Sequence, residues 1–230
     1  MNFSKLLAAS LIAISSFVMA DMKPYIEGQL INIYPDDVGG SYSESASLSG
    51  LTLTGNLKGE LEYDSEVDGG FEIGFKLQDN HRFGFSYSQP DFEFKKMDLT
   101  ASITLTDGIT TITESASGEV TRAELATIGE ENLLDNEVKL YMLNYYYDFN
   151  AQESFRPFIG AGLGLADIDN AKDKEFTYSF YAGAKHYFNE NTYLGAKYTY
   201  STINGLTDKN NVQYDDIDSH AGSILIGFEF

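Results

Sequence analysis

The chain has 230 residues and a formal net charge of −20, with 35 acidic and 15 basic side chains. This acidic balance argues against nucleic acid as a partner, because binding to phosphates requires a basic face. The absence of cysteine excludes disulfides and thiolate chemistry. We expect no cofactor, no metal site and no catalytic residues, since none of the motifs for such sites stands in the sequence.

The first twenty residues have the plan of a secretory signal peptide. Lys5 precedes an apolar run from Leu6 to Val18, and the small residue Ala20 stands at the expected cleavage site. The run is too short for a membrane-spanning helix. We therefore expect residues 1–20 to be a signal peptide and residues 21–230 to be one exported domain.

The exported part is dominated by apolar and polar residues that alternate with a period of two, which predicts β-strands. Most of these segments have about the length that a tilted strand needs to cross a bilayer. They cover residues 24–34, 71–77, 81–88, 138–149, 156–167, 176–188, 192–203 and 223–230. The sequence thus predicts an all-β fold, an antiparallel eight-stranded transmembrane β-barrel.

The connections between these segments alternate between short and long. Residues 78–80, 150–154 and 189–191 are short turns, whereas about 35–68, 97–136, 168–174 and 204–217 form long loops. Short turns at one end and long loops at the other are typical of bacterial outer-membrane barrels. The segments 35–68 and 97–136 each hold eight acidic residues and one basic residue. We expect these loops to be extracellular and to offer a site for a surface ligand.

The second long loop contains the stretch LTASITLTDGITTITES, in which Thr, Ile and Leu alternate around Asp107 and Gly108. An Asp-Gly pair between alternating residues is a strong signal for a β-hairpin. One interpretation is a ribbon that protrudes from the membrane, with a strand edge suited to adhesion. The alternative is a barrel of ten strands, which the Thr- and Ser-rich faces disfavour as lipid-contacting surfaces.

Charged residues of both signs lie on the polar faces of the predicted strands. An eight-stranded barrel has an interior just wide enough for side chains, so these groups are expected to pair inside a packed, polar lumen. The predicted charge network consists of Glu72, Lys76, Arg82, Lys185, Lys197 and Glu229. Gly160, Gly162 and Gly164 share one face of their strand, and we expect them to face the lumen and leave room for larger neighbours.

Two stretches of the chain resemble the small outer-membrane β-barrels of Gram-negative bacteria, a superfamily that includes the OmpA transmembrane domain, OmpX and the opacity-type, porin-like barrels. One is YYYDFNAQESFRPFIGAGLGLA, and the other is the C-terminal strand that ends in Phe228-Glu229-Phe230. The resemblance implies that Ile224, Ile226, Phe228 and Phe230 form the signal read by the barrel-assembly machinery. It also implies contact with outer-membrane lipid and lipopolysaccharide.

Function is less sharply defined than fold. The interpretation we favour is a non-enzymatic outer-membrane protein that serves envelope structure or surface interaction and adhesion through its acidic loops. One alternative is a narrow, porin-like channel, which requires a continuous wet lumen. A further alternative is a lipid-modifying barrel enzyme, but Ser219 and Ser223 should not meet His220, because neighbouring and odd-spaced residues of a strand point to opposite faces.

Overall fold

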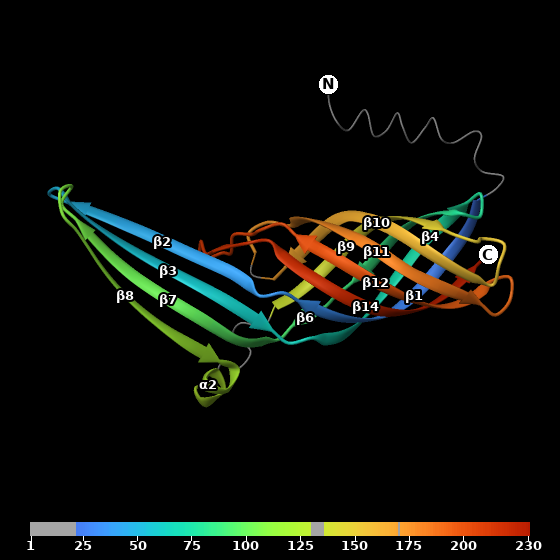
Figure 1. Cartoon of the computed structure of the whole chain (residues 1–230), viewed down its shortest axis with the longest axis horizontal. Helices are drawn as coiled ribbons and strands as arrows, with labels where there is room; N and C mark the ends of the chain where they lie inside the picture. The colour runs from blue at the N-terminus through green and yellow to red at the C-terminus, as the bar shows by residue number, and fades with distance from the viewer. Residues whose placement is uncertain (1–21, 130–135, 170) are drawn as a thin grey trace, which may run out of the picture.

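The computed structural model describes residues 22–129, 136–169 and 171–230, which form two antiparallel β-sheets and one short helix (Figure 1). The predicted signal peptide, residues 1–20, lies outside the described residues. Within the described part of the chain, no helix is long and apolar enough to cross a membrane.

Eight antiparallel strands close into a barrel, which confirms the predicted fold. Each strand pairs with its neighbours along the chain of barrel strands, and pairing between the first and the last closes the circle. The two-residue strand β6 (Asp91–Phe92) pairs with β9 at the rim. The barrel strands are β1 (Met22–Pro35), β4 (Glu66–Leu77), β5 (His81–Ser88), β9 (Asn136–Asp148), β10 (Phe155–Ile168), β11 (Glu175–Tyr187), β12 (Thr192–Ile203) and β14 (Ile217–Glu229).

The period of two in the sequence sets which side chains point outward from the barrel. In β14, Ile224, Ile226 and Phe228 are exposed on the outside, whereas Leu225 and Glu229 are buried inside. The same alternation recurs in β10, where Ile159 and Leu163 face outward. The barrel therefore presents a largely apolar surface, as a strand in contact with hydrocarbon requires.

The segments 35–68 and 97–136 do not consist of loops, and the prediction is wrong on this point. Most of the first segment forms β2 (Val38–Leu48) and β3 (Leu51–Tyr63), and the second contributes to β7 (Phe94–Thr106) and β8 (Thr111–Thr121). Together with β13 (Gln213–Tyr214) they form a five-stranded sheet in the order β13-β2-β3-β7-β8. We call this the protruding sheet, because it extends from one end of the barrel (Figure 1).

Local sequence accounts for the hairpins of the protruding sheet. The β2–β3 turn places Ser49 and Gly50 at positive φ, and the β7–β8 turn places Gly108 at φ +86°. The predicted hairpin around Asp107 and Gly108 is confirmed, and its strands lie outside the barrel, so the ten-strand alternative is wrong. After β8, the short helix α2 (Arg122–Thr127) begins with a capping box between Thr121 and Glu124.

The short turns and the C-terminus lie at the end of the barrel opposite the protruding sheet (Figure 1). There the backbone N–H of Phe230 donates to the carbonyl of Pro24 at 2.9 Å, which joins the chain end to β1. We call this the short-turn end, and the other the long-loop end. The two ends differ in what fills the barrel.

Candidate functional site

Charged side chains fill the barrel interior toward the short-turn end. The predicted network residues Glu72, Lys76, Arg82, Lys185, Lys197 and Glu229 are all buried there, together with Glu27 and Asp148. They come from β1, β4, β5, β9, β11, β12 and β14. We call this set, with the tyrosines that bind it, the lumen plug.

Asp148 of β9 is the carboxylate at which two cations of the lumen plug meet. Arg82 Nε donates to Asp148 Oδ2 at 3.0 Å, and Lys185 Nζ lies 3.4 Å from the same oxygen. The Arg82 guanidinium also lies 4.3 Å from the centroid of the Tyr146 ring, and its Nη1 is 3.9 Å from Glu27 Oε2. Buried charges of this kind are tolerated only when they are paired and hydrogen-bonded.

A second ion pair closes the lumen near the chain end. Lys76 of β4 lies 3.2 Å from Glu229 of β14, and both side chains are buried. The hydroxyl of Tyr187 also donates to the Glu229 carboxylate. This arrangement ties β4, β11 and β14 together across the interior.

The two remaining network residues are held by neutral partners. Glu72 accepts hydrogen bonds from the hydroxyls of Tyr25 at 2.5 Å and Tyr146 at 2.8 Å, and from Asn144 Nδ2 at 2.7 Å. Lys197 donates to Gln29 Oε1 at 2.8 Å. The structure therefore brings the predicted charges into one region but holds some of them through amides and tyrosines.

The sequence interpretation missed these tyrosines. Tyr25, Tyr146, Tyr181, Tyr187 and Tyr193 are buried inside the barrel, and each hydroxyl donates to a carboxylate or amide oxygen. Their position was available in the sequence, because Tyr187 has the same strand parity as Lys185. The predicted network was drawn from charged residues alone, whereas a buried tyrosine serves equally well as a hydrogen-bond donor.

The three glycines of β10 lie beside the lumen plug. A Cβ atom at Gly162 would stand 2.3 Å from Asn144 Oδ1 and 2.5 Å from the hydroxyl of Tyr181. At Gly160 it would stand 2.5 Å from the Tyr146 ring. At Gly164 it would stand 2.1 Å from the carbonyl oxygen of Tyr141. All four contacts lie below the separation that a real Cβ atom shows, so neighbouring side chains, and at Gly164 the backbone of β9, occupy the space that the glycines leave.

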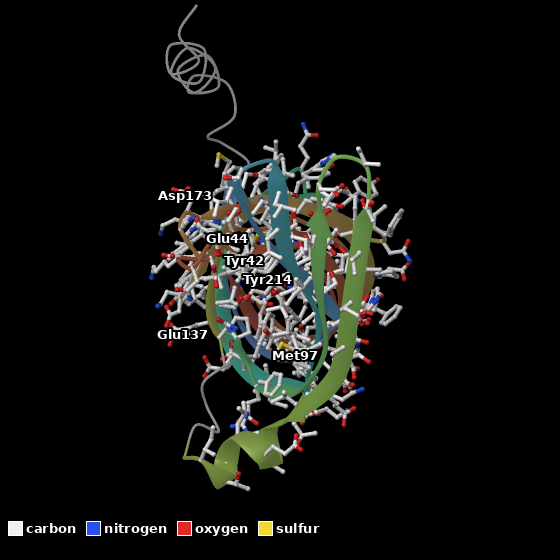
Figure 2. All side chains as sticks on the ribbon, turned by 90° about the vertical axis from the view of Figure 1, so that its left-hand side faces the viewer. Tyr42, Glu44, Met97, Glu137, Asp173 and Tyr214 are labelled. Atoms are coloured by element: carbon white, nitrogen blue, oxygen red, sulfur yellow. The ribbon has the colours of Figure 1, made fainter. Side chains whose placement is uncertain are left out.

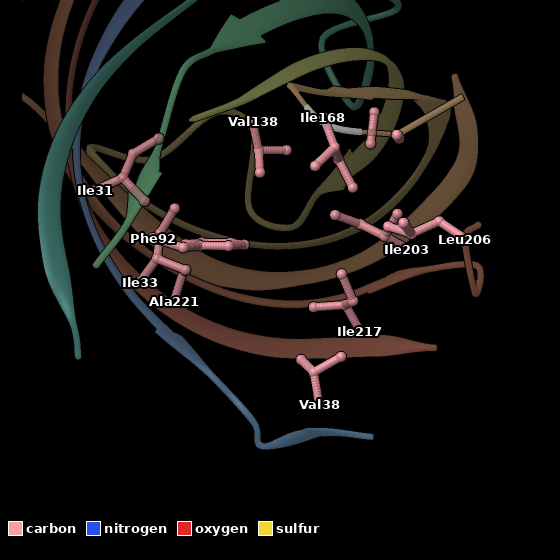
Figure 3. Packing of buried hydrophobic residues seen from close by; sticks show 12 residues of the cluster. Ile31, Ile33, Val38, Phe92, Val138, Ile168, Ile203, Leu206, Ile217 and Ala221 are labelled. Carbon is pink, nitrogen blue, oxygen red and sulfur yellow. The ribbon is translucent and has the colours of Figure 1, made fainter. Parts of the chain in front are cut away.

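Toward the long-loop end the lumen is apolar, which corrects the prediction of a polar interior throughout. A buried cluster fills this half, and Figure 3 shows how its side chains converge from several strands. The lumen is apolar here because runs such as Leu30-Ile31-Asn32-Ile33 have apolar residues on both faces of the strand. The members of the buried cluster include Ile31, Ile33, Val38, Phe92, Val138, Ala166, Ile168, Ile203, Leu206, Ile217 and Ala221.

A cavity of about 410 Å³ opens within this apolar half, at the long-loop end. We call it the vestibule. Apolar side chains from both sheets line it, and polar side chains of Asn136, Asp208 and Asn210 are the exceptions. Tyr214 of β13 also lines the vestibule, and Figure 2, viewed from the protruding sheet, labels it among the side chains at that end.

The protruding sheet has two chemically different faces, because the register of its strands places apolar residues beside apolar residues and polar residues beside polar residues. Leu53 of β3 pairs with Leu105 of β7, which pairs with Ile112 of β8. On this apolar face the exposed large side chains are Leu48, Leu51, Leu53, Leu57, Ile103, Leu105 and Ile112. Contiguous exposed apolar patches are characteristic of interaction surfaces in proteins.

The opposite, polar face consists mainly of serine and threonine. Across β2 and β3 the hydroxyls of Ser45 and Thr54 are 3.0 Å apart, and those of Ser47 and Thr52 are 2.9 Å apart. Across β7 and β8, Thr104 and Thr113 are also 3.0 Å apart. These side chains satisfy one another in pairs across the strands.

The residues that the sequence assigned to barrel assembly lie on the outside of the last strand. Ile224, Ile226 and Phe228 are exposed there, as is the terminal Phe230, whose ring packs against that of Phe228 with centroids 5.1 Å apart. Their recognition by the assembly machinery stays a prediction.

Possible catalytic and metal-binding side chains are dispersed. His220 accepts from or donates to the Tyr198 hydroxyl at 2.6 Å on the exposed side of β14, whereas Ser223 is buried inside the barrel. Within residues 22–129, 136–169 and 171–230, no group of three or more His, Asp or Glu side chains is placed to hold a metal ion.

Comparison with known proteins adds independent evidence. The family model of the outer membrane protein β-barrel domain matches residues 5–230. The outer membrane protein PagN of Salmonella typhimurium is 31% identical over 83 residues, a match that covers 28% of this chain and 35% of PagN. The chain thus aligns with about a third of the length of that relative.

Solved structures show a likeness in fold at low sequence identity. The outer membrane protein OprG of Pseudomonas aeruginosa superposes with a TM-score of 0.50 at 15% identity, covering 92% of this chain and 96% of OprG. Neisserial surface protein A gives a TM-score of 0.46 at 16% identity, covering 90% of this chain and 97% of that protein. Because the family model matches nearly the whole length of the chain, this chain belongs to the outer membrane protein β-barrel domain family and is a bacterial outer-membrane protein.

Proposed function

We propose that this outer-membrane barrel is a non-enzymatic surface-interaction protein, which uses the apolar face of the protruding sheet to bind a protein on another cell. The observation that carries the proposal is the row of exposed apolar residues across β3, β7 and β8, including Leu53, Ile103 and Ile112. A face of this kind at the extracellular end of a membrane barrel is positioned to meet another surface. The cores of protein interfaces have the same apolar character.

Charge at the borders of the apolar face defines the partner further. Glu44 of β2 and Glu114 of β8 lie in register with Gly55 and Ile103, so an exposed carboxylate flanks the face on each side. A partner of complementary chemistry presents an apolar patch bordered by lysine or arginine. Such border charges raise the association rate and are screened by salt.

The lumen plug argues against the alternative function of a channel. Charged groups and tyrosines fill the short-turn half, and the side chains of Arg82, Lys185 and Asp148 in it are at most 1% exposed. A conducting pore needs a continuous wet path. We therefore expect no stepwise conductance when the purified protein is inserted into planar lipid bilayers, and stable, ohmic current steps would contradict a closed lumen.

Adherence to cultured epithelial cells tests the proposed function. Leu53→Ser combined with Ile103→Ser removes apolar surface at the centre of the face and leaves the barrel untouched. Bacteria that carry this double variant should adhere at least ten-fold less than bacteria with the unchanged protein, to the level of bacteria without it. Surface labelling of intact cells confirms that both forms are displayed equally.

A matched control uses the other face at the same level of the sheet. Thr54→Gln with Thr104→Gln alters the polar face and should keep adherence. Glu44→Lys with Glu114→Lys should lower adherence, because the border would then repel a basic partner. The proposal is overturned if bacteria adhere equally with and without the protein, or if the apolar-face and polar-face variants lose adherence equally.

A further inference from the structure

The vestibule is a cavity that is open at the long-loop end, lined mainly by apolar side chains and built from both sheets. Its volume of about 410 Å³ falls within the range of small-molecule sites in proteins. Side chains of the barrel strands, such as Val138 and Ile168, form its walls with residues of the protruding sheet, such as Leu61. A cavity whose walls come from segments far apart in the sequence is formed by the fold as a whole.

The lumen narrows below the vestibule. Phe92 lines both the vestibule and a smaller void of only about 70 Å³, which is walled by Ile31, Ile33 and Ala221 and by serine and threonine side chains, and which reaches Lys197 of the lumen plug. A molecule that enters from outside therefore stops in the apolar half. The geometry favours binding over passage.

The apolar face of the protruding sheet leads into this space. Val38 and Leu61 pair across β2 and β3 on the same side of the sheet as Leu53 and Leu57, and both line the vestibule. An apolar molecule that contacts the sheet would thus meet apolar side chains continuously as far as the cavity. Entry would not require it to cross a charged rim.

The few polar groups of the vestibule restrict the head group of a ligand. The Asp208 carboxylate, which is mostly buried, accepts the backbone N–H groups of Asn210 and Val212, both at 2.8 Å. A second negative charge placed beside it would be repelled. The Asn210 amide also lines the vestibule, as does that of Asn136, whose Nδ2 donates to the Tyr63 hydroxyl at 3.3 Å, so polar groups that suit a neutral head group are present at the opening.

We propose that the vestibule binds a single hydrocarbon chain whose polar head group carries no negative charge. The chain lies among the apolar walls, and the head group lies near the amides at the opening. The hydrocarbon chain can come from a free amphiphile outside the cell or from a lipid of the surrounding membrane. This site is separate from the apolar face used in the proposed function.

Because the sequence contains no tryptophan, the fluorescence of a single introduced tryptophan can report binding at its own position. Tyr214→Trp places a sole tryptophan at the vestibule, and Phe180→Trp places one on the lipid-facing side of β11, where Phe180 is exposed. Each protein is inserted into lipid nanodiscs and titrated with 12-bromododecan-1-ol, whose bromine quenches nearby tryptophan. Quenching at position 214 should saturate and be reversed by unlabelled dodecan-1-ol, whereas quenching at position 180 should rise in proportion to the amount added.

Two further arms define the ligand. At pH 8, 12-bromododecanoate should bind at position 214 at least ten-fold more weakly than the alcohol, because its head is anionic. Nanodiscs made with phospholipid brominated on the acyl chains distinguish the sources. Quenching at position 214 in these discs without added alcohol identifies a membrane lipid, and its absence identifies a free amphiphile.

Filling the cavity tests the location. In the Tyr214→Trp protein, Val138→Phe should weaken the saturable quenching at least ten-fold, while a shift in gel mobility on boiling shows that the barrel is folded. If that variant does not fold, Leu206→Asn, in the loop before β13, replaces an apolar wall residue without changing a strand and should weaken binding as well. Quenching that fails to saturate at position 214, or that neither variant alters, overturns the proposal, as does equal binding of the carboxylate.

Discussion

The barrel and the protruding sheet are built from the same alternation of apolar and polar residues but have opposite surroundings. In the barrel, the apolar face with Ile159 and Leu163 points outward, and the inward face carries bonded charges toward the short-turn end and apolar side chains toward the long-loop end. In the protruding sheet, both faces are accessible, and Leu53 and Ile103 remain exposed. Alternation therefore defines two faces of a strand, while the closure of the sheet determines what each face meets.

The two sheets should also differ in their tolerance of substitution. Inside the barrel each side chain has close neighbours on adjacent strands, as at Gly164, whereas a Cβ atom at Gly55 in the protruding sheet would have no neighbour within 4 Å. Substitutions in the barrel should therefore affect folding. Substitutions in the protruding sheet should affect recognition.

The largest expected effect is on barrel assembly. Gly164→Val places a Cβ atom 2.1 Å from the Tyr141 carbonyl oxygen, so β9 and β10 cannot keep their separation. We expect the variant to remain unfolded, with the same gel mobility before and after boiling. Gly55→Val, the matched change in the protruding sheet, should fold like the unchanged protein. A folded Gly164→Val barrel would contradict the packing described for β10.

A smaller but still large effect is expected from the lumen plug. Asp148→Ala leaves the buried Arg82 and Lys185 without the carboxylate that pairs with both. Breaking a buried ion pair in this way costs about 3–5 kcal/mol, so the midpoint of unfolding by urea in lipid vesicles should fall clearly. Asp98→Ala, which removes an exposed carboxylate from the protruding sheet, should leave the midpoint where it was. Equal midpoints for all three proteins would show that the plug does not stabilise the barrel.

The smallest expected effect is a pH dependence of the protruding sheet. The hydrogen bond from Lys95, followed by that from Lys96, lowers the pKa of Glu62 below its ordinary value of 4.5. Because the folded state has the lower pKa, the stabilisation is present above about pH 4.5 and is lost as the pH falls through the lowered value. The protection factors of amide hydrogens in β3 and β7, which remove the pH dependence of intrinsic exchange, should fall slightly over that range. In Glu62→Gln the exchange should lack this step, and an identical step there would assign it to another group.

Sequence alone was sufficient for much of the barrel. The outward set in β14 and the buried position of Lys76, Arg82 and Lys185 follow from strand parity, because apolar residues of the opposite parity, such as Phe75, Phe83 and Ala184, occupy the lipid-facing side of the same strands. The partners of these charges did not follow, since pairing across the lumen depends on the stagger of strands that are distant in the chain. Thus Asp148 receives both Arg82 and Lys185, which no local pattern indicates.

The protruding sheet and the vestibule were harder to predict for different reasons. Strand β3 pairs with β7, although β4 and β5 lie between them in the sequence. No local sequence pattern indicates that two Ser- and Thr-rich segments this far apart will pair. In the apolar half of the lumen, Leu30 and Ile31 are both apolar, so alternation does not separate the outward from the inward side chain. Closure of the barrel resolves this, because Leu30 is 55% exposed and Ile31 is 9% exposed.

Under the proposed function, the barrel serves as a scaffold and the protruding sheet makes the contact with another cell. The register allows the sheet to be removed cleanly, since Gly39 pairs with Glu60 and Met97 pairs with Val120. Replacing residues 40–59 and 98–119 each by Asn-Gly, which favours a tight hairpin turn, leaves the eight barrel strands unchanged. The direct measurement is the adherence of bacteria that display this shortened, heat-modifiable barrel to epithelial cells. We expect adherence no higher than that of bacteria without the protein, and adherence equal to that of the full-length protein would show that the barrel alone makes the contact.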